Sequence, residues 1–595
     1  MNYLNKNNNL SNKRVLGIIG MGPRGLYALE NLIIGLSEKN SLKNLHMLLF
    51  EETGYFGNGA VYRLDQVETN WINISERILI LESRPKIILD TITIPEFPSY
   101  HEWISKEFSL LSNKEPDNYP PRAKVGAYLH KRFETFIKPL LEIEMVSLFK
   151  EKVQVVDLLE NNKLKVETNL NTYDYLDEIL LTIGHQPTAL SKQLIAWEKY
   201  AQENENVTLC KAPYPIQNIL DCAYLDTKKT IGVRGFGLAM IDVVRGIASQ
   251  YGNFTIIDEQ THACEYTSTF DIKNWFVPFS LDGLPPAPKP LNAEIDELFK
   301  PSQKHISNFE DEIGNPSIQR SATNSDFLID AISKITAAIY LNLPTSNSEE
   351  HLDHKETTRL VKNWLKNDSF EHAIITSKKL ATTQQMENYV GMAVGNKTVS
   401  LDFCIGQVWR HCQPSIYKQL SYNECNNEVF AEIINLDERM KRYAYGPPVE
   451  SIQQLLALVS AGVMTFDFIN DPEIKRTGEG WNFISDDKHK MVHFMIDSVL
   501  DSPEIKSVTS SVVKQLLLND LIKPVHDDLG ILTDKKGYLI PNDSKKFVPI
   551  ALLGRLAKGT IIGVDAILEC FGDRPKSWSK EAVKRHMNWI EINNH

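Results

Sequence analysis

The chain lacks the patterns that mark disulfide-stabilised, zinc-binding and membrane-spanning proteins. Its seven cysteines are dispersed, and neither a CxxC nor an HExxH motif occurs anywhere in the 595 residues. An odd, scattered set of thiols is typical of a reduced cytoplasmic protein, and it excludes the paired thiols of a disulfide reductase. Without paired ligands we expect no metal site. No apolar run approaches the ~20 residues of a transmembrane helix, so we predict a cytoplasmic protein that needs no membrane.

An excess of positive charge is also missing. The chain carries 64 Lys and Arg against 76 Asp and Glu, a net charge of -12. Nucleic-acid binding depends on a basic surface that displaces counterions, so we expect no nucleic-acid partner. The composition, 42% hydrophobic and 24% charged, is that of a folded globular protein. The length exceeds what one hydrophobic core accommodates, which predicts several domains.

The most informative motif is a glycine-rich turn near the start. An apolar run, Val15 to Ile19, is followed by the order GxGxxG and then by a helical pattern. These are the strand, tight turn and helix start of a dinucleotide-binding unit, whose helix N-terminus holds a pyrophosphate with free amides and its dipole. An ordinary strand-loop-helix turn is the alternative. The candidate cofactor contacts of this turn are Gly20, Gly22, Pro23, Arg24 and Gly25.

Residues after the turn provide further candidate ligands. A second apolar run, Leu45 to Phe50, ends on Glu51, where a carboxylate can accept hydrogen bonds from a ribose. Gly57 lies in the glycine-rich loop that follows, and Asn73 stands just before an apolar strand. Arg122 begins an amphipathic helix after two prolines. The alternatives are a plain turn for Gly57 and Asn73 and a solvent-exposed side chain for Arg122.

A second unit of the same kind begins at Thr230. An apolar strand breaks at Gly235 and Gly237, and an apolar helix starts at Leu238, although Met240 stands where the third glycine would be. Two such units in one chain predict two bound dinucleotides.

The choice of coenzyme stays open. The next predicted strand, Asn253 to Ile257, ends at Asp258 and Glu259, and acids there favour an unphosphorylated ribose and hence NADH. Against this, Arg234 and Lys289 lie close enough in sequence to bind a 2′-phosphate.

The loop Pro278 to Asn292 is rich in proline and glycine, so it is either an active-site wall or a domain linker. From residue 294 to about 528 the signals become helical, without a repeat, and indicate an insertion or cap. The clearest helical patterns are 326–341, 357–365, 429–440 and 451–459.

Taken in order, six segments resemble the FAD/NAD(P)-binding flavoprotein monooxygenases: GIIGMGPRGL, FGNGAVY, PPRAKVGAYL, LLTIGH, RGFGLAMIDVV and PFSLDGLPPAPKP. This family is related to the flavin-dependent N-hydroxylating monooxygenases, among them enzymes that oxidise the amine of aspartate towards nitrosuccinate. The resemblance implies an α/β fold with two Rossmann-like dinucleotide-binding domains and a large, mostly helical additional region. The implied domains are 1–205 for the first part of the FAD domain, 206–293 for NAD(P), 294–528 for the helical insertion, and 529–595 for the return to the FAD domain.

The resemblance also implies the cofactors and the reaction. FAD would bind the first unit and NAD(P)H the second, and reduced flavin would take up O2 as a C4a-hydroperoxide that a neutral amine attacks. Thr182 and Gly184 would lie near the flavin, as would Gly563 and Asp565, where a late helix start would face the reduced ring.

The substrate is expected to be a small amine or amino acid. At least one arginine would hold the carboxylates of an acidic substrate, and the candidates are Arg320, Arg410 and Arg442. No side chain is assigned a catalytic role. Two alternative functions stay open: another flavin oxidoreductase (a carbon or sulfur monooxygenase, an oxidase or a reductase) and a non-catalytic nucleotide-binding protein. For the assembly, a homo-oligomer also stays open.

Overall fold

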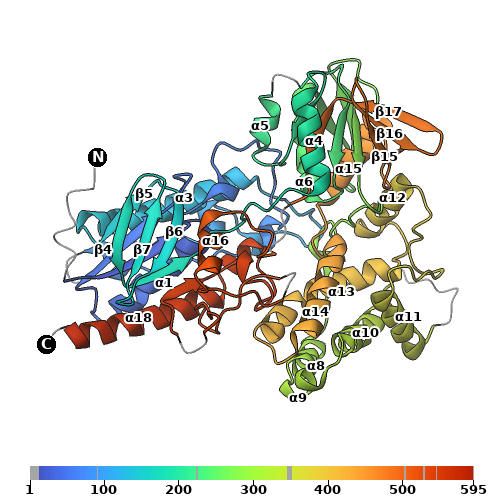
Figure 1. The fold of residues 1–595 in the computed structure, drawn as a ribbon. Coiled ribbons are helices and arrows are strands. Elements are labelled where there is room, and N and C mark those ends of the chain that lie inside the picture. The colour runs from blue at the N-terminus through green and yellow to red at the C-terminus, as the bar shows by residue number, and fades with distance from the viewer. Residues whose placement is uncertain are drawn as a thin grey trace.

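The computed structural model describes residues 12–89, 92–222, 225–344, 352–500, 504–526, 529–543 and 546–593. Figure 1 shows three parts: a sheet with its helices at the left, a second sheet at the upper right, and a group of helices below it. The predicted α/β class with two parallel sheets and an additional helical region is confirmed.

The first sheet has five parallel strands in the order β19-β9-β1-β2-β5. Its central strand is buried on both sides, as parallel strands require. Leu16 and Ile18 face helices α1, α3 and α18, while Val15 and Ile19 face the small antiparallel sheet β6-β7-β8. The strands are β1 (Arg14–Ile19), β2 (Leu45–Phe50), β5 (Val146–Phe149), β6 (Val153–Leu158), β7 (Leu164–Thr168), β8 (Thr172–Leu176), β9 (Glu178–Leu181) and β19 (Ile550–Leu552).

The helices of this part follow the sequence pattern. The predicted helix after the glycine turn is α1 (Pro23–Ser37), and the one that Arg122 begins is α3 (Arg122–Glu142). The last helix of this part, α18 (Asp573–Asn593), packs against α1.

The second sheet has four parallel strands in the order β10-β18-β11-β14. One face packs on α6 (Leu238–Tyr251), and the other packs on α4 and the antiparallel sheet β15-β16-β17. The strands are β10 (Thr208–Cys210), β11 (Ile231–Arg234), β14 (Phe276–Phe279), β15 (Glu473–Arg476), β16 (Trp481–Ser485), β17 (Lys488–Val492) and β18 (Phe494–Asp497).

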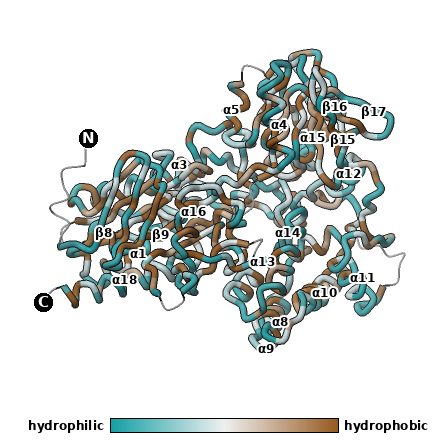
Figure 2. Tube along the Cα trace, in the orientation of Figure 1, coloured by the Kyte–Doolittle hydropathy of each residue, from teal (hydrophilic) through white to brown (hydrophobic). Residues whose placement is uncertain are grey.

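Two sequence expectations are corrected here. The predicted strand 253–257 forms as β12 (Gly252–Asp258), but it pairs with β13 (Ala263–Ser268) in a separate hairpin and not with β11. The region 294–528 is not helical over 473–497, where four strands occur. These strands are short and several are polar, as the teal hairpin around β17 in Figure 2 shows. They therefore contain no apolar run from which a strand could be predicted.

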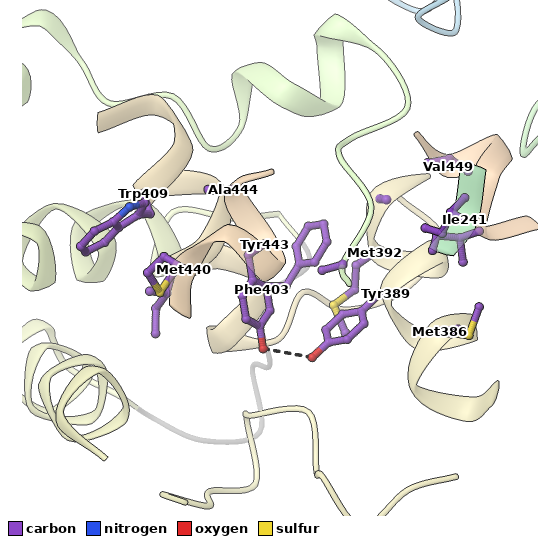
Figure 3. Packing of buried hydrophobic residues seen from close by; sticks show 14 of the residues in the cluster. Ile241, Met386, Tyr389, Met392, Phe403, Trp409, Met440, Tyr443, Ala444 and Val449 are labelled. Atoms are coloured by element: carbon purple, nitrogen blue, oxygen red, sulfur yellow. Dashed lines mark hydrogen bonds between the residues drawn. The ribbon is translucent and has the colours of Figure 1, made fainter. Parts of the chain in front are cut away.

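The four helical patterns in the third part are confirmed as α10, α11, α14 and α15. Figure 3 shows part of the buried cluster where α14 and α15 pack with α12 and α13, and where the hydroxyls of Tyr389 and Tyr443 point toward one another at 3.2 Å. Both hydroxyls also donate to the buried Asp402 carboxylate, at 2.9 and 3.1 Å. The four confirmed helices are α10 (Asp326–Tyr340), α11 (His354–Lys366), α14 (Asn427–Ala444) and α15 (Val449–Ser460). The other α-helices not yet given are α2 (Tyr100–Trp103), α4 (Lys192–Glu203), α5 (Ile216–Leu220), α7 (Ala293–Glu297), α8 (Gln303–Ile313), α9 (Pro316–Ser321), α12 (Thr382–Ala393), α13 (Leu401–Leu420), α16 (Ser511–Leu518) and α17 (Ile567–Cys570).

Among the described residues, no helix is both long enough and apolar enough to cross a bilayer.

Candidate dinucleotide sites

The first glycine turn has the geometry that its sequence predicts. Gly20 has φ of +91°, and a Cβ there would lie 2.6 Å from the Thr182 carbonyl oxygen. A Cβ at Gly25 would lie 2.5 Å from the Gly20 carbonyl oxygen, so α1 can approach β1 this closely only with glycine. Helix α1 begins at Pro23 with neither a side-chain cap nor an acidic residue in its first turn. Its first amides therefore stay available for a phosphate, which fits a dinucleotide.

Glu51 and Thr182 lie at this turn and hold it in place. The Glu51 carboxylate, 8% exposed, accepts from the Met21 backbone N–H at 2.9 Å and from the Thr53 hydroxyl at 2.7 Å. The Thr182 hydroxyl donates to the Gly20 carbonyl. Glu51 thus occupies the predicted place, although its carboxylate also orders the turn itself.

The glycine-rich loop after β2 lies over the turn. Gly57 donates its N–H to the Met21 carbonyl at 2.6 Å, and its Cα packs against Phe133 of α3. The glycine nearest the turn is Gly59, where a Cβ would be 3.0 Å from the Gly22 Cα. Sequence reasoning did not single out Gly59, because a glycine-rich loop does not reveal which of its members approaches the turn.

The late segment expected at the flavin has a different local structure. Asp565 does not begin a long helix, since α17 (Ile567–Cys570) is a single turn. Its carboxylate pairs with Lys441 at 2.6 Å and with Arg555. Burial raises the pKa of this carboxyl, but the Lys441 and Arg555 charges outweigh it and hold the pKa well below the usual range. Gly563 has φ of +77° and packs against the Tyr417 ring.

Arg24 connects the first turn to this segment. Its guanidinium donates to the Val564 carbonyl at 3.2 Å. The C-terminal return of the chain therefore does reach the glycine turn, as expected, although the contact is made by Arg24 and not by Asp565.

Asn73 and Arg122 connect the first sheet to the other two parts. Asn73 donates its side-chain N–H to the Tyr445 carbonyl at 3.0 Å. Arg122 Nη2 lies 3.6 Å from Asp242 Oδ2 on α6, and the Tyr214 hydroxyl donates to the same carboxylate at 2.6 Å. Both residues thus take part in contacts between the three parts.

The second glycine turn, like the first, leaves its helix start free. Gly235 has φ of +110°, and α6 begins after Gly237 with neither a side-chain cap nor an acidic residue in its first turn. A Cβ at Gly237, or at Gly184 beside the first turn, would meet no atom within 4 Å. Leu238, the first residue of α6, is half-buried. The open space at Gly237 fits the backbone approach that a pyrophosphate needs.

The two sheets share the same hydrogen-bonding pattern around these turns. Gly20 donates its N–H to the Phe50 carbonyl at 2.9 Å, and Gly235 donates to the Phe279 carbonyl at 2.8 Å. On the other side, the Thr182 hydroxyl donates to the Gly20 and Ile19 carbonyls, and the Ser498 hydroxyl donates to the Arg234 carbonyl at 2.5 Å.

This pattern identifies β14 as the second unit's counterpart of β2. In the first unit, Glu51 is the residue that follows β2. The corresponding residue of the second unit is the one that follows β14, which is Ser280. Asp258 is the last residue of the separate hairpin strand β12, and Glu259 follows it. The preference for NADH inferred from these two acids therefore loses its structural basis.

The three candidate arginines are in different places. Arg320 is exposed on α9, at the lower end of the helical part in Figure 1. Arg410 pairs with Asp296, whose carboxylate also lies 3.3 Å from His411. Arg442 pairs with Asp282 of the loop that follows β14. Only Arg410 and Arg442 therefore lie against that loop or the segment after it.

Lys289 is a residue that sequence reasoning considered only for a phosphate contact. It is 9% exposed, and its ammonium donates to the Asn73 carbonyl while its backbone N–H donates to the Pro447 carbonyl at 3.0 Å. Burial, reinforced by the charge of Arg410, lowers the pKa of Lys289 to about 7. The first domain, the loop after β14 and the end of α14 thus meet at this lysine.

Two adjoining cavities open beside the same loop. One, of about 390 Å3, is lined by Arg439, Arg442 and Tyr443 of α14, and the other has about 610 Å3. Both are bounded by Asp282, Leu284, Lys378 and Gln385. The proline-rich loop is therefore a wall of these cavities. Its interpretation as an active-site wall stays a prediction.

Residues 17–186 match the FAD-NAD(P)-binding family model. This part of the chain is an FAD- and NAD(P)-binding domain. The match covers the first glycine turn, Glu51, Arg122 and Thr182, and it confirms the predicted family over this range. A curated relative, nitrosuccinic acid synthase npaA of Aspergillus oryzae, is 26% identical over 233 residues, which are 38% of this chain and 34% of the relative. The alignment thus spans about a third of that protein's length.

Three solved enzyme structures are similar to this chain only in general outline. Cyclohexanone monooxygenase from Rhodococcus sp. Phi1, bound to NADP+, is 11% identical with a TM-score of 0.45 over 97% of this chain and 87% of its own. L-lysine 6-monooxygenase from Pseudomonas syringae is 12% identical, with a TM-score of 0.45 over 96% and 99%. Ornithine hydroxylase from Pseudomonas aeruginosa is 11% identical, with 0.43 over 97% and 99%.

Proposed function

We propose that this protein is an FAD- and NAD(P)H-dependent monooxygenase that hydroxylates the amine nitrogen of a small amino acid. Aspartate, oxidised towards nitrosuccinate, is the first substrate to test, because the curated relative is named for that product. The observation that carries the proposal is the presence of two uncapped glycine turns, at Gly20 and Gly235, in one chain and with the same hydrogen-bonding pattern.

The proposed domains follow from this assignment. Residues 1–205 and 529–595 form the FAD domain, 206–293 form the core of the coenzyme domain, and 294–528 form the helical region. Strands β15 to β18, within the last range, are assigned to the coenzyme domain because β18 pairs with β11.

In this assignment the chain's residues bind and shield the cofactors. Gly20, Gly22 and Gly25 would hold the FAD pyrophosphate at α1, and Gly235 and Gly237 would hold that of the coenzyme at α6. When bound, FAD supplies the redox chemistry by accepting a hydride from the nicotinamide and, once reduced, activating O2. The loop at Gly57 and Gly59 covers the first turn, a position suited to limiting the entry of water.

The proposed substrate site is the junction at Lys289. The substrate must reach the flavin, and at this lysine the first domain, the loop after β14 and the turn after α14 are in contact. Lys289, Arg410 and Arg442 are the candidate cations for the carboxylates of an acidic amino acid. In the free protein Arg410 is ion-paired with Asp296 and Arg442 with Asp282. With a pKa of about 7, Lys289 is also able to bind or release a proton near neutral pH.

The test is an assay of the purified protein with a panel of amino acids. We expect a yellow protein whose NAD(P)H oxidation rises when aspartate or another small amino acid is added. The product should carry at least one oxygen atom from 18O2 on nitrogen. A protein that binds no flavin, even when FAD is supplied, would contradict the proposal. Coenzyme oxidation that no amine stimulates, with all oxygen recovered as peroxide, would favour an oxidase or reductase instead.

A further inference from the structure

We propose that the cavity of about 390 Å3 beside α14 binds a free aromatic amino acid, as a ligand that is not the substrate of the reaction. The buried carboxylate of Asp402 would accept from the ammonium of this ligand, and Arg439 and Lys378 would hold its carboxylate. The inference goes beyond the proposed function, because it assigns a second small-molecule site to the helical part of the chain.

The cavity lies on the side of α14 that faces away from the first domain. Its lining comes from the loop after β14, from the segment between Trp364 and Lys378, and from α12, α13 and α14. Arg439 and Tyr443 are four residues apart, so they share the face of α14 that lines the cavity. Lys441 lies midway between them in sequence and points to the opposite side of the helix, where it pairs with Asp565 at 2.6 Å. Helix α14 therefore separates this cavity from the late segment expected at the flavin.

Asp402 is a buried carboxylate in the wall of this cavity, with 1% of its surface exposed. It accepts from the Tyr389 and Tyr443 hydroxyls at 2.9 and 3.1 Å, and from the Thr376 backbone N–H at 2.9 Å. Figure 3 shows the two hydroxyls approaching one another from α12 and α14. All three donors are neutral, and no cation in the described parts of the chain pairs with Asp402.

This arrangement suits a ligand ammonium. A buried carboxylate that lacks a cation costs free energy, because its charge is removed from water without compensation. A carboxylate has about four acceptor positions, of which the protein donors fill three at Asp402. An ammonium bound at the remaining position would satisfy it and supply the missing positive charge.

Two cations of the lining have neutral hydrogen-bond partners. Arg439 donates to a backbone carbonyl at the end of α11, and its Nε is buried with no hydrogen-bond partner among the described residues. Lys378 is exposed and donates to the Asp368 backbone carbonyl. The third cation, Arg442, is ion-paired with Asp282. Arg439 and Lys378 are therefore the cations that can form charge-assisted hydrogen bonds with a ligand carboxylate.

The balance of charge also favours a ligand with one charge of each sign. Two carboxylates of the lining are neutralised by ion pairs, Asp282 by Arg442 and Glu371 by Lys379 at 2.8 Å. The charged groups that remain are two cations and two carboxylates, which are Arg439, Lys378, Asp368 and Asp402. A zwitterion leaves this balance unchanged, whereas a simple anion or cation would disturb it.

Aromatic rings form the apolar part of the cavity. Trp364 and Tyr443 meet edge to face with their centroids 5.6 Å apart, and Tyr389 meets Tyr443 in the same way at 5.9 Å. Phe370 also lines the cavity. Another ring can stack on or against such rings, and their faces attract an ammonium group. The size of the cavity is typical of small-molecule sites, so rings and charges together fit an aromatic amino acid.

Calorimetry of the FAD-loaded protein without reduced coenzyme tests the proposal in the absence of turnover. The probes are L-phenylalanine, phenethylamine, which lacks the carboxylate, and phenylpropionate, which lacks the ammonium. L-phenylalanine should bind at least about tenfold more tightly than either analogue. Arg439→Gln and Lys378→Ala should each weaken L-phenylalanine about fivefold or more and leave phenethylamine unchanged. Asp402→Asn should weaken L-phenylalanine and leave phenylpropionate unchanged.

Lys397→Ala is the matched control. Lys397 is an exposed lysine of the same helical part that donates to Asn388 at 2.8 Å, and its replacement should change the binding of none of the probes. Because Lys378 is also exposed, Lys378→Ala leaves the fold intact, and a failure of Asp402→Asn to fold does not remove the test. Binding of L-phenylalanine no tighter than that of its analogues would overturn the proposal. An unchanged affinity in both Arg439→Gln and Lys378→Ala would overturn it as well.

Turnover distinguishes this inference from the proposed function. With NAD(P)H and O2, L-phenylalanine should be recovered unchanged. If it is instead converted to an N-hydroxylated product and Lys378→Ala prevents this, the cavity is the substrate site, which overturns the inference and supports the proposed reaction. A protein that binds L-phenylalanine as described but hydroxylates no amine would retain the inference and contradict the proposed reaction.

Discussion

Lys289 donates a hydrogen bond from its buried ammonium to the backbone carbonyl of Asn73. The bond connects the loop after β14 to the first domain, and burial places the pKa of this lysine at about 7. A buried cation at this position costs free energy, since desolvation disfavours the charged form.

Lys289 should make stability depend on pH. Its pKa is about 7 when folded and about 10.5 when unfolded, so between these values the unfolded chain binds more protons and stability rises with pH. The cost of burying the charged lysine is fully present below about pH 7 and is relieved as the pH rises to about 10.5. The slope is at most about 1.4 kcal/mol per pH unit. Urea unfolding of the wild-type protein and Lys289→Met at pH 7.5 and 9.5 checks this: the wild type should gain stability relative to the variant, and parallel curves would contradict the assignment.

Gly237→Ala should separate coenzyme binding from folding. A Cβ there meets no protein atom within 4 Å, so the free energy of unfolding should change by less than about 1 kcal/mol. The same Cβ would stand where a pyrophosphate approaches the backbone, so coenzyme affinity should fall about tenfold or more. Gly478→Ala, another glycine with open space at its Cβ, is the control. An unchanged coenzyme Kd in Gly237→Ala would place the second dinucleotide elsewhere.

Gly20→Ala should remove flavin binding through strain in the turn itself. With φ of +91° and the Thr182 carbonyl 2.6 Å from the new Cβ, the turn must move. We expect a colourless protein or one with a melting temperature several degrees lower. Gly184→Ala is the control, because Gly184 also has a positive φ but an added Cβ there would have open space. A difference between the two variants therefore measures the steric clash at Gly20 and not the cost of a positive φ. Equal flavin content in the two variants would argue against a tight turn at Gly20.

Arg122 and Asp242 should be coupled across the two domains. The side chains are 21% and 8% exposed and lie 3.6 Å apart. Burial raises the pKa of Asp242, and the Arg122 charge opposes that shift. Arg122→Ala should therefore destabilise the protein by about 1–3 kcal/mol, much of it from the carboxylate left buried. In a double-mutant cycle with Asp242→Ala, unfolding energies that simply add would contradict this coupling.

The candidate arginines should differ in their effect on substrate binding. Arg410→Ala and Arg442→Ala should raise the KM for an acidic amino acid about tenfold, because each lies against the loop of the proposed site or the segment after it. Arg320→Ala is the matched control, since Arg320 is exposed on α9. An Arg320 variant with the largest KM would show that the substrate binds within the helical part.

The elements were predictable wherever one pattern determined them. The turns at Gly20 and Gly235 follow from glycine spacing after an apolar strand, and α10 and α14 follow from helical periodicity. What failed was pairing over long range. The local sequence does not determine that β12 pairs with β13 and not with β11. Nor does it determine that β18 pairs with β11, about 260 residues earlier in the chain. The roles of Ser280 and Lys289 depend on that pairing, so the sequence pattern could not reveal them.

The late position of β18 in the chain also determines when the second sheet can form during synthesis. Strand β11 has β14 on one side and β18 on the other, and β10 reaches the sheet only through β18. A ribosome would therefore release the whole helical part before the second sheet could form completely. A fragment ending at residue 293 would leave β11 with a bare edge, a surface on which unpaired strands aggregate.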